Sequence, residues 1–278
     1  MNIYTISNSD LELSVMDYGA TIVSLKYKGT ETVQRHESLD EYKNDGSYLC
    51  KTVGRYANRI GKSSFNLEGV EYTLTPNEGR NQLHGGPESY SERIWSVEEG
   101  SDFVNMSIFS PNGDNGFPGN LNMTVKFIIM GSTLRVEFEG ECDKTTVFAP
   151  TVHPYFISDN AKMKLNCTEH VEVDDELIPT GRILKCEGKY DYTEMKAVST
   201  NLDDAFVSPE EFSLYYESRD FGMEVWTDFP AVQVFSGRAG GVAIEPEFYP
   251  DSPNHKEFPD TTLHPGTKFN KYCEYRFK

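Results

Sequence analysis

Short segments in which apolar and polar residues alternate recur along the whole chain, and this alternation constrains the fold most strongly. Residues 134–139 read LRVEFE, as expected for a strand with one face in water. Residues 103–108, 122–127 and 224–227 alternate in the same way, less strictly. Between such segments lie turn clusters rich in glycine, proline, asparagine and aspartate, such as residues 111–116. Short strands joined by turns predict an all-β sandwich or barrel rather than alternating β and α units.

Helical signals are few and short. Residues 208–212 (SPEEF) begin with a capping serine, a proline at the first helical position and early acidic residues, which predicts a short helix. Residues 38–44 are a similar candidate. We find no repeat of fixed period and no linker-like segment, so the sequence predicts a single domain over residues 1–278.

The chain carries a strong excess of negative charge. Its 278 residues include 26 Lys and Arg against 44 Asp and Glu, a formal net charge of −18. Such a charge repels nucleic acid phosphates and anionic membrane surfaces, so neither is an expected partner. The sequence begins without the pattern of a signal peptide, contains no apolar run of membrane-spanning length, and has five scattered cysteines without a C-x-x-C pair. We therefore expect a cytoplasmic protein that binds an unphosphorylated small molecule.

Several familiar catalytic patterns are missing from the sequence. The triplet Gly61, Lys62 and Ser63 resembles the end of a phosphate-binding loop, but Tyr56 stands where that loop requires glycine. There is no G-x-S-x-G motif, so hydrolysis by a nucleophilic serine lacks support. The six histidines include no H-x-H or H-x-x-x-H pair, which disfavours a metal site.

Polar residues occur instead in a series of specific blocks. In chain order these are GRYANRI at 54–60, QLHGG at 82–86, APTVHPYF at 149–156, LDDAF at 202–206, AVQVF at 231–235 and IEPEFYPDSPN at 244–254. Together they resemble the aldose 1-epimerase (galactose mutarotase) family, and the resemblance covers nearly the whole chain. It implies an all-β fold, a large antiparallel β-sandwich of the galactose mutarotase-like supersandwich type with few short helices.

The resemblance also implies roles for residues in these blocks. Glu245 is similar to the family's general base, and His153 is similar to its general acid. The substrate-binding residues implied are Asn58, Arg59, His84, Asp203 and Gln233. Asp204 stands where many relatives have a histidine, so the sugar-contacting carboxylate is either Asp203 or Asp204. No metal ligand is implied.

The chemistry of mutarotation fits these residue types. The reaction removes a proton from the anomeric hydroxyl and delivers one to the ring oxygen; the ring opens, the C1–C2 bond rotates, and the ring closes on the other face. Two proton-transfer groups suffice, so no cofactor is expected. At neutral pH a glutamate is a ready base, and a histidine is poised as an acid whose protonated fraction nearby charge would raise. Arg59 would offer fixed donors to the oxygen that gains charge during ring opening.

The sequence thus predicts an isomerase of carbohydrate metabolism that interconverts the α and β anomers of a free hexose such as galactose or glucose. It leaves open an epimerase for a phosphorylated sugar, which would need clustered arginine or lysine. It also leaves open a non-catalytic sugar-binding protein on the same scaffold, and a glycosidase, for which a convincing second carboxylate is lacking. It does not indicate which aldose is preferred, or whether the protein is a monomer or a homodimer.

Overall fold

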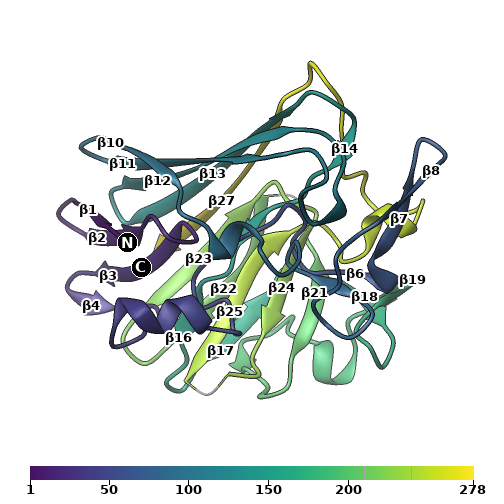
Figure 1. Ribbon diagram of the computed structural model, residues 1–278. Coiled ribbons are helices and arrows are strands. Elements are labelled where there is room, and N and C mark those ends of the chain that lie inside the picture. Colours follow the sequence, from purple (N-terminus) through teal and green to yellow (C-terminus); the bar gives the residue numbers. More distant parts are fainter. Residues whose placement is uncertain (210, 239) are drawn as a thin grey trace.

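Antiparallel strands build this protein (Figure 1). The computed structural model describes residues 1–209, 211–238 and 240–278. Within these ranges the strands form three larger sheets and four two-stranded ones. The expected all-β antiparallel sandwich with few short helices is confirmed. No helix in the described ranges is long and apolar enough to cross a membrane.

The largest sheet of the described chain is formed by nine strands. In spatial order they are β10 (Ser96–Glu99), β11 (Phe103–Ser110), β12 (Leu121–Met130), β13 (Thr133–Cys142), β27 (Phe269–Phe277), β23 (Gly222–Thr227), β22 (Glu211–Glu217), β17 (Lys162–Leu165) and β20 (Lys196–Ala197). All four alternating segments of the sequence analysis lie in this sheet, in β11, β12, β13 and β23, as predicted. In β12 and β13 nearly every second side chain is buried, which is the pattern of strands with one face in the core.

A second sheet faces the first and carries the candidate site. Its six strands within the described chain are, in spatial order, β16 (Tyr155–Ile157), β25 (Gly241–Glu247), β24 (Ala231–Phe235), β21 (Asp203–Val207), β18 (Glu169–Val173) and β19 (Pro179–Lys185). The ring of Phe156 lies 5.1 Å from that of Tyr275 in the larger sheet, and the Tyr275 hydroxyl donates to the carbonyl of Ile244 at 3.1 Å. Phe156 lies directly opposite Val242 on β25, so Val242 and Ile244 share the face toward the larger sheet, and the residues between them point to the opposite face.

The outer face of β25 is also covered. All seven residues of this strand are buried, although the larger sheet packs against one face. The cover includes Thr151, whose hydroxyl donates to the carbonyl of Pro246 at 2.5 Å, and Asn58, whose amide donates to Glu247 Oε1 at 2.9 Å. The two-stranded pairs of the described residues are β5 (Thr52–Val53) with β15 (Thr151–Val152), β6 (Arg59–Ile60) with β9 (Gln82–Leu83), β7 (Ser64–Leu67) with β8 (Val70–Thr73), and β14 (Thr146–Val147) with β26 (Thr262–Leu263).

The remaining sheet lies near both ends of the chain. Its four described strands, in spatial order, are β1 (Ile3–Ser7), β2 (Leu11–Met16), β3 (Thr21–Tyr27) and β4 (Thr30–Glu31). The ring of Tyr27 stacks on that of Phe277 with centroids 5.5 Å apart, so the N-terminal sheet meets the last strand (Figure 1).

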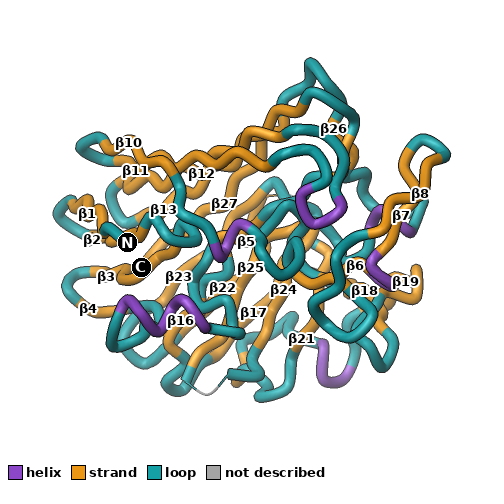
Figure 2. The backbone as a smooth tube through the Cα atoms, in the orientation of Figure 1, coloured by secondary structure: helices purple, strands orange, loops and turns teal. Residues whose placement is uncertain are grey.

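The helices are short 3₁₀ segments in the connections between strands (Figure 2). In the described ranges they are η1 (Leu39–Asn44), η2 (Gly61–Ser63), η3 (Tyr90–Glu92), η4 (Asp114–Gly116), η5 (Gly188–Tyr190) and η6 (Ser252–Asn254). The helix predicted over residues 38–44 is confirmed by η1. The helix predicted from Ser208 is wrong, because β22 begins at Glu211; residue 210 lies outside the described ranges.

Candidate active site

A cavity of about 380 Å³ opens on the outer face of the six-stranded sheet. All seven residues that the sequence analysis assigned to the site line it: Asn58, Arg59, His84, His153, Asp203, Gln233 and Glu245. They come from six segments that are separated along the chain, so the fold brings them together.

Pairing between strands fixes the floor of this cavity. Gln233 on β24 lies directly opposite Glu245 on β25. Asp203 on β21 lies opposite Phe235, one step along the same face of β24. Since successive side chains of a strand point to opposite faces, Glu245 faces the cavity while Ile244 packs in the core.

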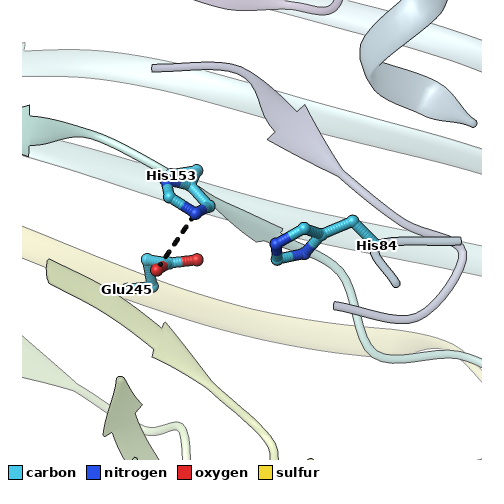
Figure 3. Close-up of side chains that lie close together, drawn as sticks. All are labelled: His84, His153 and Glu245. Carbon is cyan, nitrogen blue, oxygen red and sulfur yellow. Dashed lines mark ion pairs between the residues drawn. The ribbon is translucent and has the colours of Figure 1, made fainter. Parts of the chain in front are cut away.

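His153 and Glu245 form a close pair in this cavity (Figure 3). The distance from His153 Nε2 to Glu245 Oε1 is 3.3 Å, and both side chains are almost fully buried. His153 lies between β15 and β16, where its backbone N–H donates to the carbonyl of Lys51 at 2.9 Å. Its ring stacks on that of Tyr155, with centroids 5.0 Å apart. Backbone and ring contacts therefore both hold the imidazole against the carboxyl.

Burial controls how this pair holds a proton. Burial lowers the pKa of His153 to about 4. Burial, reinforced by the neighbouring carboxyl of Glu247, raises the pKa of Glu245 well above its ordinary value. Both shifts favour a proton on Glu245 rather than on His153. Burial outweighs the nearby charge of Asp45, which acts in the expected direction and raises the pKa of His153.

His84 is held as a neutral hydrogen-bond donor. Its Nδ1 accepts the backbone N–H of Asn58 at 3.1 Å, so the proton of the neutral ring is on Nε2. Burial and the nearby His153 lower the pKa of His84 well below its ordinary value. Its ring contacts that of His153 edge-on, with centroids 5.3 Å apart, and points toward the pair in Figure 3. His84 can thus donate to a ligand from Nε2.

Two histidines and one carboxylate also raise the question of a metal ion. Ligand atoms of His84, His153 and Glu245 lie within 4.8 Å of one another, a grouping that spacing along the sequence did not predict. A histidine that binds a metal almost always donates its other ring N–H to an acceptor. His84 does the reverse, since Nδ1 accepts a backbone N–H and leaves the proton on Nε2. This hydrogen bond disfavours a metal ion at the site.

Arg59, Asp203 and Gln233 form one connected polar wall. Arg59 donates from Nε and Nη2 to Glu78 at 2.7 and 3.0 Å, and its Nη1 lies 3.7 Å from Asp203 Oδ2. Gln233 Nε2 donates to Asp203 Oδ1 at 2.6 Å. Burial raises the pKa of Asp203, and the positive charge of Arg59 opposes that shift. Arg59 is therefore both a structural ion-pair partner and part of the cavity wall.

The side chain of Asn58 makes two hydrogen bonds within the protein. Its amide Nδ2 donates to Glu247 Oε1 at 2.9 Å, and its Oδ1 accepts the backbone N–H of Arg59 at 2.8 Å. Asn58 lines the cavity, but its side chain is already bonded within the protein. Glu247 itself was missed by the sequence analysis. Glu247 lies two residues from Glu245 on β25 and so shares its face, but its burial depends on the contact with Asn58, which leaves no local pattern in the sequence.

The cavity rim contains aromatic and cationic side chains that the sequence analysis did not assign. Tyr48, Tyr155 and Phe235 line it, and flat rings of this kind suit the apolar faces of a sugar. Arg238 also lines it; its Nη1 donates to Ser47 Oγ at 2.7 Å. These residues lie in or beside loops whose approach to the site is not visible in a one-dimensional pattern.

Comparisons with known proteins identify the family of this chain. A family model described as aldose 1-epimerase matches residues 2–276. An aldose 1-epimerase of Haemophilus influenzae is 31% identical over an alignment of 323 residues that covers 99% of this chain and 95% of that protein. A galactose mutarotase of Homo sapiens is 25% identical, with 99% of this chain and 93% of that protein covered. These matches confirm the resemblance read from the sequence blocks.

Solved structures give the same result for the fold. A GalM/aldose epimerase homologue from C. elegans superposes with a TM-score of 0.95 at 26% identity, covering 100% of this chain and 98% of that chain. A galactose 1-epimerase from Lactobacillus acidophilus superposes with a TM-score of 0.90 at 22% identity, covering 99% and 93%. The similarity to the Lactobacillus acidophilus structure, at 22% identity, supports the fold and nothing further.

Proposed function

This chain belongs to the aldose 1-epimerase family, and we propose that it interconverts the α and β anomers of a free hexose such as galactose or glucose. It is an enzyme of the isomerase class. The observation that carries the proposed reaction is the contact of 3.3 Å between His153 Nε2 and Glu245 Oε1 in a cavity large enough for a pyranose.

The proposed mechanism needs one proton shared by this pair. Glu245 takes the proton of the anomeric hydroxyl while His153 gives one to the ring oxygen, and the ring opens to the aldehyde. After rotation about C1–C2, His153 takes the proton of the attacking hydroxyl and Glu245 returns one to the carbonyl oxygen. The pair ends with the proton it began with, so no cofactor is required. Both reacting oxygens are bonded to the same carbon, which is why a base and an acid in contact suit the reaction.

Substrate binding prepares the pair for these roles. Glu245 Oε2 is buried and has no hydrogen-bond partner among the described residues. A sugar hydroxyl that donates to this oxygen would favour the carboxylate and allow the shared proton to move to His153 Nε2. Glu245 would then be the general base and His153 the general acid.

The rest of the cavity wall would bind the sugar hydroxyls. Asp203 and Arg59 offer a charged acceptor and charged donors, and Gln233 Oε1 is a buried acceptor without a partner among the described residues. His84 offers a neutral donor from Nε2. Hydrogen-bond donors that the protein fixes near the reacting oxygens would stabilise the charge that develops as the ring opens.

We propose an unphosphorylated sugar rather than a sugar phosphate. The two arginines of the cavity each have acidic neighbours: Arg59 pairs with Glu78, and Arg238 Nη1 lies 4.0 Å from Asp45 Oδ1. Little positive charge therefore remains for a phosphate group. We further propose that the protein acts in the cytoplasm as a monomer or homodimer, with neither nucleic acid nor membrane as partner, as its net charge of −18 supports.

The test follows the optical rotation of fresh α-D-galactose and α-D-glucose. We expect wild type to accelerate relaxation to the equilibrium anomer mixture, and Glu245→Gln to reduce kcat by about 10²- to 10⁴-fold, since it removes one proton-transfer group. Glu274→Gln, a carboxyl of β27 outside the cavity, is the control and should retain activity. If wild type does not accelerate mutarotation, or Glu245→Gln retains full activity, the proposal is wrong. Tight sugar binding in calorimetry without catalysis would indicate a sugar-binding protein instead.

A further inference from the structure

A second buried carboxyl lies behind the site and has no role in the proton transfers described above. Glu245 and Glu247 sit two residues apart on β25 and are 1% and 0% exposed. Because they share a face of the strand, both point toward the loops that cover the sheet. Burying an acidic side chain is costly unless its contacts compensate. Glu247 therefore calls for a physical account.

The contacts of Glu247 lead to the other half of the site. Glu247 Oε1 accepts the amide of Asn58 at 2.9 Å. The backbone N–H of the same asparagine donates to His84 Nδ1 at 3.1 Å, and its Oδ1 accepts the backbone N–H of Arg59 at 2.8 Å. One carboxyl thus anchors the segment that fixes His84 and Arg59.

Two residues of the site have an uncommon backbone conformation. Asn58 and His84 have φ of 61° and 50°, in the left-handed region where residues other than glycine are uncommon. Hydrogen bonds link the two residues in both directions, because the backbone N–H of His84 also donates to the carbonyl of Asn58 at 3.1 Å. The Asn58 side chain is in turn held by Glu247. Loss of the Glu247 acceptor would release a buried amide and loosen the segment.

We propose that Glu247 is a positioning residue: through Asn58 it holds the side chains of His84 and Arg59 in place relative to Glu245. The inference rests on the proposed function, since it concerns the same site. The loop after Ala57 and strand β25 both contribute residues to the site, and the buried hydrogen bond from Asn58 to Glu247 joins them.

The charge of Glu247 adds a second effect on Glu245. Burial raises the pKa of Glu247 to about 8, against the hydrogen bond from Asn58. The negative charge of Asp203 raises this pKa further, and Arg59 lowers it. Once ionised, Glu247 opposes ionisation of Glu245 and so raises the pKa of that residue. An amide at position 247 could accept the hydrogen bond from Asn58 but would lack this charge.

Two substitutions separate these effects. Glu247→Gln keeps an acceptor for Asn58 and removes the charge, so kcat/KM at the optimum should stay within a few-fold of wild type. The alkaline limb of its pH profile should move to lower pH, because the shared proton of Glu245 and His153 is lost more easily. Glu247→Met keeps the volume and removes the acceptor; we expect kcat/KM to fall by roughly tenfold to a hundredfold, as for the loss of a buried hydrogen bond. Circular dichroism checks that each variant is folded.

A double-mutant cycle tests whether Glu247 acts through Asn58. If it does, combining Glu247→Met with Asn58→Ala should lower kcat/KM no further than the more damaging single substitution. Imidazole ¹⁵N NMR gives a readout that needs no activity: the His84 nitrogens should report a proton on Nε2 in wild type and Glu247→Gln, and mixed tautomers in Glu247→Met.

The possible outcomes are distinct. Additive losses in the cycle, or a folded Glu247→Met with wild-type kcat/KM and unchanged His84 signals, would overturn the positioning role. An alkaline limb that does not move in Glu247→Gln would overturn the effect of charge on Glu245. If wild type itself does not accelerate mutarotation, the proposed function fails instead, whereas the NMR result still tests the contact between Glu247, Asn58 and His84.

Discussion

Asp203 and Asp204 are neighbours in the chain but face opposite sides of β21. Asp203 lines the cavity and is bonded to Gln233, whereas Asp204 Oδ2 accepts the backbone N–H of Asp203 at 3.1 Å. The sequence left open which of the two contacts the sugar. The geometry favours Asp203, because in a strand a shift of one residue changes the face.

A matched pair of substitutions tests this assignment. Asp203→Asn should lower kcat/KM for galactose or glucose by roughly tenfold to a hundredfold, the typical loss for a hydrogen bond to a charged group, with most of the change in KM. Asp204→Asn changes the same group one residue away and should leave KM near the wild-type value. Initial rates by polarimetry give both constants. A larger KM effect at Asp204 would reverse the assignment.

Glu247 shows which site residues the sequence could not supply. The blocks that resemble the family predicted seven residues, and all of them line the cavity. Glu247 lies in the same block as Glu245, two positions further on, but an acidic residue near a turn is more often exposed. Its burial depends on the loop around Asn58, which is 189 residues away in the chain. A contact at that separation leaves no local signal.

The turn that carries His84 depends on close approach of two backbone segments. Gly85 has φ of 87°, and a Cβ at this position would lie 2.1 Å from the carbonyl oxygen of Gly54. We expect Gly85→Ala to destabilise the fold by more than ~2 kcal/mol, since strain in the left-handed region adds to a backbone clash. Displacement of the turn should also lower kcat/KM by moving the His84 ring. Denaturant unfolding and polarimetry measure the two effects.

Gly69 offers the control for this prediction. It has φ of 82°, similar to that of Gly85, but nothing lies within 4 Å of an added Cβ. Gly69→Ala should therefore cost about 1 kcal/mol, the conformational part alone, and leave kcat/KM unchanged. Equal losses of stability in the two variants would mean that the close approach to Gly54 adds nothing to the cost of Gly85→Ala in the free energy of unfolding.

Strand β22 shows where local signals mislead. Ser208 and the residues after it have the composition of a helix start, yet residues 211–217 pair with β23 and β17. The segment EFSLYYE buries Leu214 and Tyr216 on the side of the core, a spacing of two that suits a strand. Capping residues contribute about 1 kcal/mol, and pairing with two neighbouring strands outweighs that preference.

The alternation of apolar and polar residues does not predict the order of strands in the sheets. Alternation predicted β11, β12, β13 and β23 as strands, because that signal is local. It could not predict that β27, at the end of the chain, pairs with both β13 and β23. That insertion joins two halves of the nine-stranded sheet in the described chain. Periodicity predicted a sandwich or a barrel, and only the resemblance to a known family indicated the sandwich.

The buried acids and histidines of the site make the stability of the whole molecule depend on pH. Burial raises the pKa of Glu247 from 4.5 to about 8, so its contribution to stability is complete below pH 4.5 and is lost as the pH rises through about 8. Burial lowers the pKa of His153 from 6.5 to about 4, so its contribution is complete above pH 6.5 and is lost as the pH falls through about 4. Between pH 6.5 and 8 the histidine contribution is constant and that of Glu247 decreases.

This window gives a prediction for Glu247→Gln, which cannot ionise. The free energy of unfolding of wild type minus that of the variant should decrease between pH 6.5 and 8, by up to ~1.4 kcal/mol per pH unit. Denaturant unfolding at several pH values measures this difference. Asp114→Asn is the control: despite burial, the bond with Arg93 lowers the pKa of Asp114, so its contribution is constant above pH 3.8 and its difference should be flat. Parallel curves for wild type and Glu247→Gln would mean that Glu247 ionises in the folded protein as it does in the unfolded chain.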